Sequence, residues 1–181
     1  MTTAQQVIAE ATKHVGYVEG PKKDNIFGKW YGVNHSAWCA EFVSYCINKA
    51  GGGALIKGAQ TAKGFNSCGA GIKFFKSKKA WFSVGHAQPG DLAFFDWDHD
   101  GSQDHVELVV KNDPKKKQVL CIGGNTSDSN HSNGGVVKKS WRSYGVIMGV
   151  GRPAYAVPAP AVAPVAPASP AVPPSAVPVA E

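Results

Sequence analysis

The chain has 181 residues, of which 43% are hydrophobic, and its formal net charge at pH 7 is +6. This length supports one good hydrophobic core, not two. The sequence has no run of about 18 uninterrupted apolar residues, which argues against a membrane-spanning protein. The N-terminal sequence MTTAQQVIAEATKHVG has neither the basic region nor the dense apolar block of a secretory signal, so we expect synthesis in the cytoplasm.

Two helices are predicted early in the chain by the three-and-four spacing of apolar residues. The first spans residues 3–14, with a threonine at its start as the cap. The second, over 37–50, is the clearest in the sequence. Ser36 is expected to cap its start, and the three glycines that follow it are expected to end it. A weaker helix is expected within 60–77.

Strand signals follow the helices in series. Short segments rich in apolar and β-branched residues predict strands at 92–95, 106–110, 118–122, 135–141 and 144–151. Helices followed by sequential strands with short connections predict an α+β fold, with the N-terminal helices packed on an antiparallel β-sheet.

The composition changes after Pro153. Residues 154–181 hold eight of the twelve prolines and a single charged residue. Such a segment cannot build a core and favours the extended polyproline II conformation. We therefore expect one domain over residues 1–153 and a Pro/Ala/Val-rich linker or tail over 154–181. A spacer of this kind suggests that a further module is missing after it.

Basic residues are concentrated in the domain. Residues 1–153 carry all nineteen Lys and Arg residues and twelve acidic residues, with the runs KSKK at 76–79 and KKK at 115–117. Such runs are most often a solvated face. The functional alternative is attraction to a polyanion, either nucleic acid or an anionic cell wall. No zinc-finger spacing, RNP-like aromatic motif or helix-turn-helix pattern supports nucleic acid, so we expect no nucleic-acid partner.

The cysteines differ in their predicted surroundings. Their spacing contains no CxxC pair, which predicts reduced thiols rather than a disulfide framework or a zinc site. Cys39 lies in the first turn of the clearest predicted helix, where unpaired amides and the helix dipole lower the pKa of a thiol. Cys46 lies roughly 10 Å further along the same helix, too far for a disulfide. Cys39 is therefore the candidate nucleophile, and Cys46, Cys68 and Cys121 are expected in the core.

Three segments, in order, resemble those of CHAP-domain peptidoglycan hydrolases, which belong to the papain-like NlpC/P60 superfamily. They are HSAWCAEFVSYCINKAGG, PGDLAFFDWDHDGSQDHVELVV and CIGGNTSDSN, with GVGRP as the closing strand. The resemblance spans nearly all of residues 5–153, and the ordered set is more specific than any one segment. It implies a papain-like CHAP fold.

The resemblance also implies roles for individual residues. Cys39 corresponds to the nucleophile and His105 to the general base, which takes the thiol proton so that the thiolate attacks an amide carbonyl. A third group must hold the imidazole in position. Asn125 matches the asparagine of the family, but Gly123 stands where many relatives carry a glutamate. Asn125 is therefore favoured as the third residue, with Glu107 or Asp128 as alternatives.

The implied activity is hydrolysis of bacterial peptidoglycan by a phage endolysin, which waits in the host cytoplasm before it reaches the cell wall. N-acetylmuramoyl-L-alanine amidase is the favoured reaction, and an endopeptidase that cuts the stem peptide or cross-bridge is the alternative. A non-catalytic, calcium-dependent wall-binding module is the rival of a different class. We expect a monomer without membrane insertion, whose partners are peptidoglycan and, if the basic runs are functional, anionic wall polymers.

The stretch DWDHDGSQDHVE at 96–107 matches the spacing of an EF-hand calcium loop, including the glycine at the sharp turn. Its flanks are strands, which predicts a calcium loop within a hairpin, and the alternative is a solvated acidic turn. Because His105 and Glu107 would share one face of a regular strand, the loop is expected to curl still at His105. The predicted Ca²⁺ ligands are Asp96, Asp98, Asp100, Ser102, Asp104 and Glu107.

Overall fold

The helices precede most of the sheet, as the sequence predicts. The computed structural model describes residues 1–127 and 134–157. Within these residues the order of helices followed by strands confirms the α+β class. The α-helices are α1 (Ala4–Thr12), α2 (Ile26–Tyr31), α3 (Cys39–Lys49) and α4 (Cys68–Ser77).

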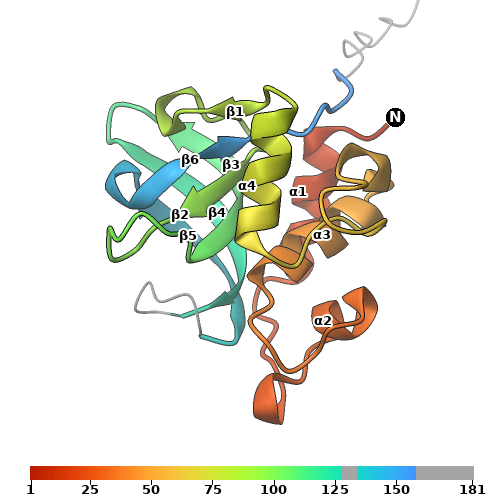
Figure 1. Cartoon of the computed structure of the whole chain (residues 1–181). Coiled ribbons are helices and arrows are strands. Elements are labelled where there is room, and N and C mark those ends of the chain that lie inside the picture. The colour runs from red at the N-terminus through yellow and green to blue at the C-terminus, as the bar shows by residue number, and fades with distance from the viewer. Residues whose placement is uncertain (128–133, 158–181) are drawn as a thin grey trace, which may run out of the picture.

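The strands form one antiparallel sheet in the order β1-β6-β2-β3-β4-β5. The last strand returns to lie between β1 and β2, so the C-terminal strand of the domain is an inner strand of the sheet (Figure 1). The strands are β1 (Trp81–Phe82), β2 (Leu92–Phe95), β3 (His105–Asp113), β4 (Gln118–Thr126), β5 (Val136–Ser143) and β6 (Ile147–Gly151).

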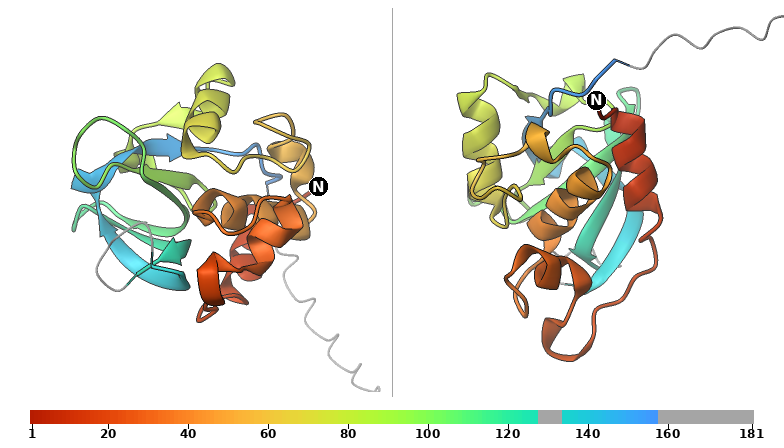
Figure 2. Two further views of the ribbon diagram at one scale, coloured as in Figure 1. Left: turned by 60° about the horizontal axis from the view of Figure 1, so that its bottom comes forward. Right: turned by 90° about the vertical axis from the view of Figure 1, so that its right-hand side faces the viewer.

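The sheet is curved, and helices α1, α3 and α4 lie against one of its faces (Figures 1 and 2). The alternation of side chains along β2 explains how both faces are filled. Leu92 and Phe94 join the core between sheet and helices, whereas Ala93 and Phe95 belong to a second apolar cluster on the other face. Both faces of β2 are therefore buried, which fits its uniformly apolar sequence.

The starts of the two predicted helices differ from one another. Thr3 caps α1 in a capping box with Gln6, as expected for a threonine at this position. The prediction that Ser36 caps α3 is wrong: the cap position is Trp38, and within the described residues no side chain makes a capping hydrogen bond there. Helix α3 consequently begins with uncapped amides at Cys39.

Helix α2 and strand β1 are absent from the sequence predictions. Helix α2 is short, and residues next to it define both of its ends. The Asn25 side chain accepts a hydrogen bond from Gly28 N at 2.7 Å, and Gly32 ends the helix with φ of 106°.

In the described part of the chain, no helix is long and apolar enough to cross a membrane.

The C-terminal segment remains in contact with the domain just beyond Pro153. The Tyr155 hydroxyl donates to Gly90 O at 2.9 Å, and Ala156 N donates to Thr2 O at 2.9 Å. The predicted linker or tail over 154–181 lies for the most part outside the described residues, which end at 157.

Candidate active site

Cys39 is the first residue of α3, and the residue before it is firmly anchored. Trp38 is fully buried, its indole nitrogen donates to Glu19 Oε2 at 2.6 Å, and its ring stacks on Phe27 with centroids 5.1 Å apart. A side chain at Gly124 on β4 would collide with Trp38 and Phe42, so the glycine allows β4 to approach this end of α3 closely. The position of the Cys39 thiol is therefore set by packing on both sides.

His105 is the first residue of β3 and is completely buried. It pairs with Phe95 in the register of β2 and β3. Its Nε2 lies 3.2 Å from Glu107 Oε1, whereas its Nδ1 has no hydrogen bond to the described residues. Nδ1 is thus the nitrogen left to exchange a proton with the thiol of Cys39, whose negative charge raises the pKa of His105.

The surroundings of Cys39 favour the thiolate. The pKa of the thiol is well below its usual range because the Cys68 thiol donates a hydrogen bond to it. Burial opposes this shift, but the charge of His105 and the backbone amide of Val106 add to it. Burial lowers the pKa of His105, yet the negative charges of Cys39 and Glu107 outweigh burial and raise it to about 9. The two shifts have opposite directions, and both favour the thiolate–imidazolium form of the pair.

The other thiols have a different character. Cys68, at the start of α4, has its Sγ 3.9 Å from that of Cys39. Burial raises the pKa of Cys46 and Cys121 well above the usual range, so they remain neutral. The described residues include all four cysteines, each as a free thiol, and their reduced state stays a prediction.

Glu107 is not placed to bind a metal ion, and its prediction as a calcium ligand is corrected. The strand is regular from His105 onward, so the expected curl at this residue is also wrong. Both residues point to the same face, where Glu107 is buried and bonds His105. Its two carboxylate oxygens also accept from Arg142, at 2.6 and 3.0 Å.

Arg142 on β5 contacts the Glu107 carboxylate and is absent from the site residues predicted from the sequence. It is buried, and besides Glu107 it donates to Thr126 Oγ1 at 3.0 Å. No local pattern in the sequence signals this contact, because 35 residues separate Arg142 from its partner.

Asn125 and Asp128 are the other two candidates for the group that orients His105. Asn125 is buried in β4 with φ of 54°, and its proposed role in orienting His105 stays a prediction. Asp128 lies outside the described residues.

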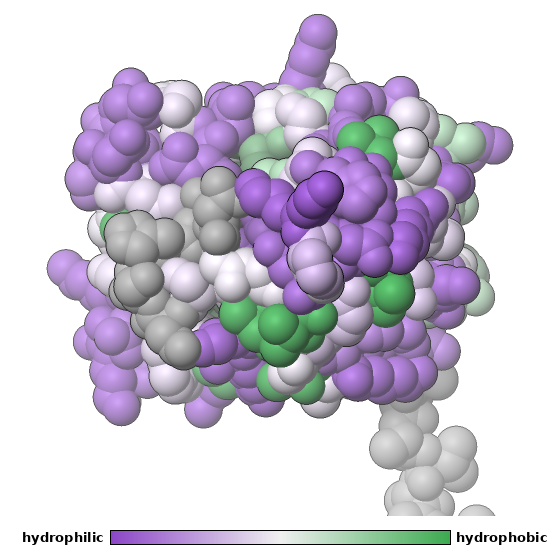
Figure 3. Space-filling model, turned by 90° about the horizontal axis from the view of Figure 1, so that it is seen from below, coloured by the Kyte–Doolittle hydropathy of each residue, from purple (hydrophilic) through white to green (hydrophobic). Residues whose placement is uncertain are grey.

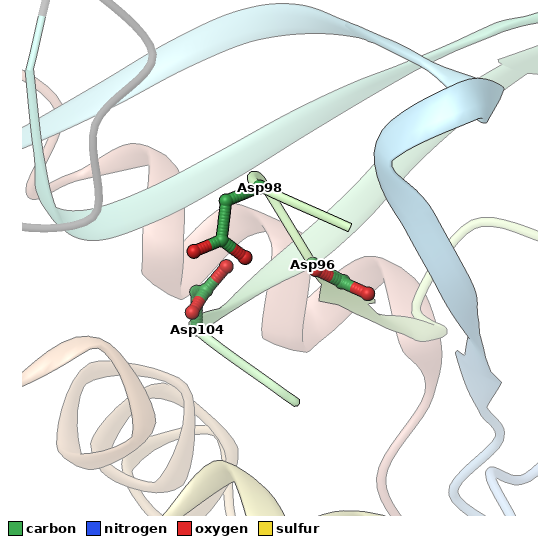
Figure 4. Close-up of side chains that lie close together, drawn as sticks. All are labelled: Asp96, Asp98 and Asp104. Atoms are coloured by element: carbon green, nitrogen blue, oxygen red, sulfur yellow. The ribbon is translucent and has the colours of Figure 1, made fainter. Parts of the chain in front are cut away.

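Three of the predicted metal ligands come together in the turn before His105. One carboxylate oxygen from each of Asp96, Asp98 and Asp104 lies within 4.8 Å of the others. Figure 4 shows the carboxylates of Asp98 and Asp104 turned toward each other, with Asp96 to one side. Asp96 Oδ1 is buried without a hydrogen-bond partner among the described residues. Clustered carboxylates and an unpaired buried oxygen fit a divalent cation with oxygen ligands.

The rest of the turn shapes this cluster. Asp96 Oδ2 accepts from Gly101 N at 3.0 Å, and Gly101 adopts the positive φ of 86° that the sharp turn needs. Asp100 is not a member of the cluster, and its Oδ1 accepts from Ser102 N at 2.7 Å. The predicted ligand roles of Asp100 and Ser102 stay predictions.

Glu41 adds a second titrating group beside the nucleophile. Burial, together with the charge of Cys39, raises the pKa of this carboxyl from 4.5 to about 7, while Asn66 partly offsets the shift. The folded protein therefore binds this proton more tightly than the unfolded chain, so the stability from Glu41 is complete below about pH 4.5 and is lost as the pH rises through about 7.

Glu41→Gln is expected to remove this contribution to the pH dependence. The melting temperature of the variant, relative to that of the parent, should be higher at pH 8 than at pH 5. The change in this difference is equivalent to at most about 3 kcal/mol of unfolding free energy. Thermal unfolding of both proteins at the two pH values measures the difference. An equal offset at both pH values would mean that Glu41 does not titrate in this range.

The side of the molecule on which α2 lies in Figure 1 is seen from below in Figure 3. It is mostly hydrophilic, with hydrophobic side chains gathered near its middle. A cavity of about 390 Å³ elsewhere, lined in part by Phe82, Asp91 and Arg152, includes neither Cys39 nor His105. That cavity is therefore separate from the Cys39–His105 pair.

Comparison with known proteins gives one match. The family model described as "CHAP domain" matches residues 30–125, a range that includes Cys39, His105 and Asn125. No curated protein and no solved structure matches the chain.

Proposed function

The chain belongs to the CHAP-domain family, whose members hydrolyse peptidoglycan, and we propose that it cleaves amide bonds of the bacterial cell wall through a cysteine thiolate. The observation that carries this proposal is the continuous series from Cys39 through His105 to Glu107. A buried thiolate at a helix start, an imidazole with one free nitrogen and a carboxylate on the other nitrogen form the arrangement that nucleophilic amide hydrolysis needs.

Each group in this series has a defined task. The Cys39 thiolate attacks the carbonyl carbon of the scissile amide, and the uncapped first-turn amides of α3 stabilise the developing oxyanion. His105 gives its Nδ1 proton to the leaving amine, which departs and leaves an acyl-enzyme. His105 then takes a proton from water, and the resulting hydroxide releases the acyl group and restores the thiolate.

The favoured bond is the one between N-acetylmuramic acid and L-alanine, and the alternative is a peptide bond within the stem or cross-bridge. Mass spectrometry of digested cell walls distinguishes them. An amidase releases intact stem peptides with a new L-alanine amino terminus, whereas an endopeptidase leaves part of the stem on the sugar. If no new terminus forms but the protein sediments with walls, the non-catalytic binding module is supported and the hydrolase is refuted.

We propose that Asp96, Asp98 and Asp104 hold a calcium ion. The cation supplies the positive charge that allows these carboxylates to lie close together. Asp104 directly precedes His105, and Asp104 N donates to Phe95 O at 2.8 Å, which closes the turn at the start of β3. The role proposed for the ion is thus to fix the turn from which the imidazole projects, and it takes no part in the chemical step.

The biological setting that we propose is that of a phage endolysin. The protein would accumulate in the host cytoplasm and act on peptidoglycan after its release to the wall, as a monomer. The face seen from below, which is mostly hydrophilic with some hydrophobic side chains, suits a polymer of sugars and short peptides (Figure 3).

The lysine-rich runs at 76–79 and 115–117 are proposed to recruit the enzyme to anionic wall polymers. Lysis of whole walls is therefore expected to fall several-fold between about 0.05 and 0.3 M salt, since charges are screened beyond about 8 Å near 0.15 M. The rate on a small soluble peptidoglycan fragment should change much less over the same range. A flat salt response on whole walls, measured by the loss of turbidity, would identify the lysine runs as a solvated face only.

A further inference from the structure

The carboxylate that pairs with His105 comes from the same strand. Glu107 follows His105 by two residues on β3, so both side chains lie on one face, and Glu107 Oε1 is 3.2 Å from His105 Nε2. The adjacent strand β4 carries Gly123 at the position where the family resemblance led us to expect a glutamate. The glycine at position 123, in place of the expected glutamate, and the glutamate at position 107 have one structural explanation.

A side chain at position 123 and the side chain of Glu107 would occupy the same space. A Cβ atom built on Gly123 would lie 2.5 Å from both Cγ and Oε1 of Glu107, a separation that real Cβ atoms essentially never show. The register of β3 and β4, with Leu108 opposite Ile122, brings the two positions next to each other. One carboxylate site beside His105 can thus be reached from either strand, but only by one side chain at a time.

Arg142 fixes the carboxylate of Glu107 from the far side of β4. Its Nε and one terminal nitrogen contact the two oxygens at 3.0 and 2.6 Å, and its guanidinium lies over the Trp97 ring, 5.4 Å from the centroid. Burial raises the pKa of Glu107, but His105 and Arg142 outweigh burial and hold it below its usual range. The carboxylate is therefore ionised, and both of its oxygens are held in place.

We propose that Glu107 is the residue that positions the imidazole of His105. Arg142 holds the Glu107 carboxylate in place, and the absence of a side chain at Gly123 leaves the space that Glu107 occupies. It follows that a carboxylate delivered from position 123 can replace one delivered from position 107. The proposal rests on the proposed function only in treating Cys39 and His105 as the reacting pair.

The first test removes the charge of Glu107 and keeps its shape. Glu107→Gln is expected to lower kcat on a soluble peptidoglycan fragment by about 10²–10⁴-fold with little change in KM, because a neutral amide orients the imidazolium poorly. The rate of Cys39 alkylation by iodoacetamide at pH 7, read by peptide mass mapping, should fall at least tenfold. Parental rates of both reactions in a folded Glu107→Gln variant would overturn the proposal.

The second test moves the carboxylate from position 107 to position 123. It also gives a result if Glu107→Gln leaves Arg142 without a charged partner and does not fold. Glu107→Gly/Gly123→Glu is compared with Glu107→Gly/Gly123→Gln, a matched pair of equal volume. Both are expected to fold, since each empties the shared space before filling it. The glutamate form should alkylate Cys39 at least tenfold faster than the glutamine form and recover part of kcat.

Equal alkylation rates in the two double variants, or failure of both to fold, would contradict the interchange. The alkylation readout needs no wall substrate. A parent protein with a reactive Cys39 that depends on Glu107, but with no release of peptidoglycan fragments, would refute the proposed function and leave this inference intact.

Discussion

Cys39→Ser is expected to reduce peptidoglycan hydrolysis by at least about 10³-fold while the fold and wall binding remain. The reason is specific to the site. The contacts with Cys68, His105 and the Val106 amide stabilise a thiolate, and none of them can ionise a serine hydroxyl to a comparable extent. Loss of turbidity of cell walls and mass spectrometry of released fragments measure activity, and thermal unfolding measures the fold.

Cys46→Ser is the matched control on the same helix. Cys46 is as buried as Cys39, but burial raises its pKa, so it remains a neutral thiol without a part in the chemistry. Its replacement should lower the melting temperature, because a hydroxyl replaces a core thiol, and should leave the rate per folded molecule within about twofold of the parent. Comparable lysis by Cys39→Ser and the parent would refute the nucleophile.

Much of the fold could be predicted because its signals are local. The apolar spacing over 37–50 predicts α3 to within two residues at its start, and the predicted strand at 92–95 has the bounds of β2. Helix α2 could not be predicted from its own sequence, since it is short and contains a glycine. Its Phe27 is instead held by stacking on Trp38, which is a tertiary contact.

The site was predictable where a single element determines the chemistry. Cys39 stands out because a helix start activates thiols, whatever lies around it. The role of Glu107 could not be assigned in this way, because the EF-hand spacing of residues 96–107 predicts that Glu107 is a metal ligand. Only the fold shows that Arg142, two strands away, and His105 occupy both of its oxygens.

Removal of calcium is expected to lower both activity and stability. Without the cation the carboxylates of Asp96, Asp98 and Asp104 repel one another, and the turn before His105 loses its shape. Free calcium at about 100 times its dissociation constant should raise the melting temperature by about 5–10 °C over the chelated protein. Magnesium should substitute poorly, since it prefers a tight six-coordinate shell and retains its waters.

Variants can separate a three-carboxylate site from a full EF-hand loop. Asp96→Asn and Asp104→Asn should reproduce the chelated state in the presence of calcium, and calorimetric titration should show weaker binding. Asp113→Asn, at the far end of β3, is the control and should bind calcium like the parent. A loss of affinity in Asp100→Asn as large as in Asp96→Asn would extend the ligand set to the predicted loop. If chelation changes neither activity nor melting temperature, the stretch at 96–107 is an acidic turn that precedes a catalytic histidine, and the calcium proposal is wrong.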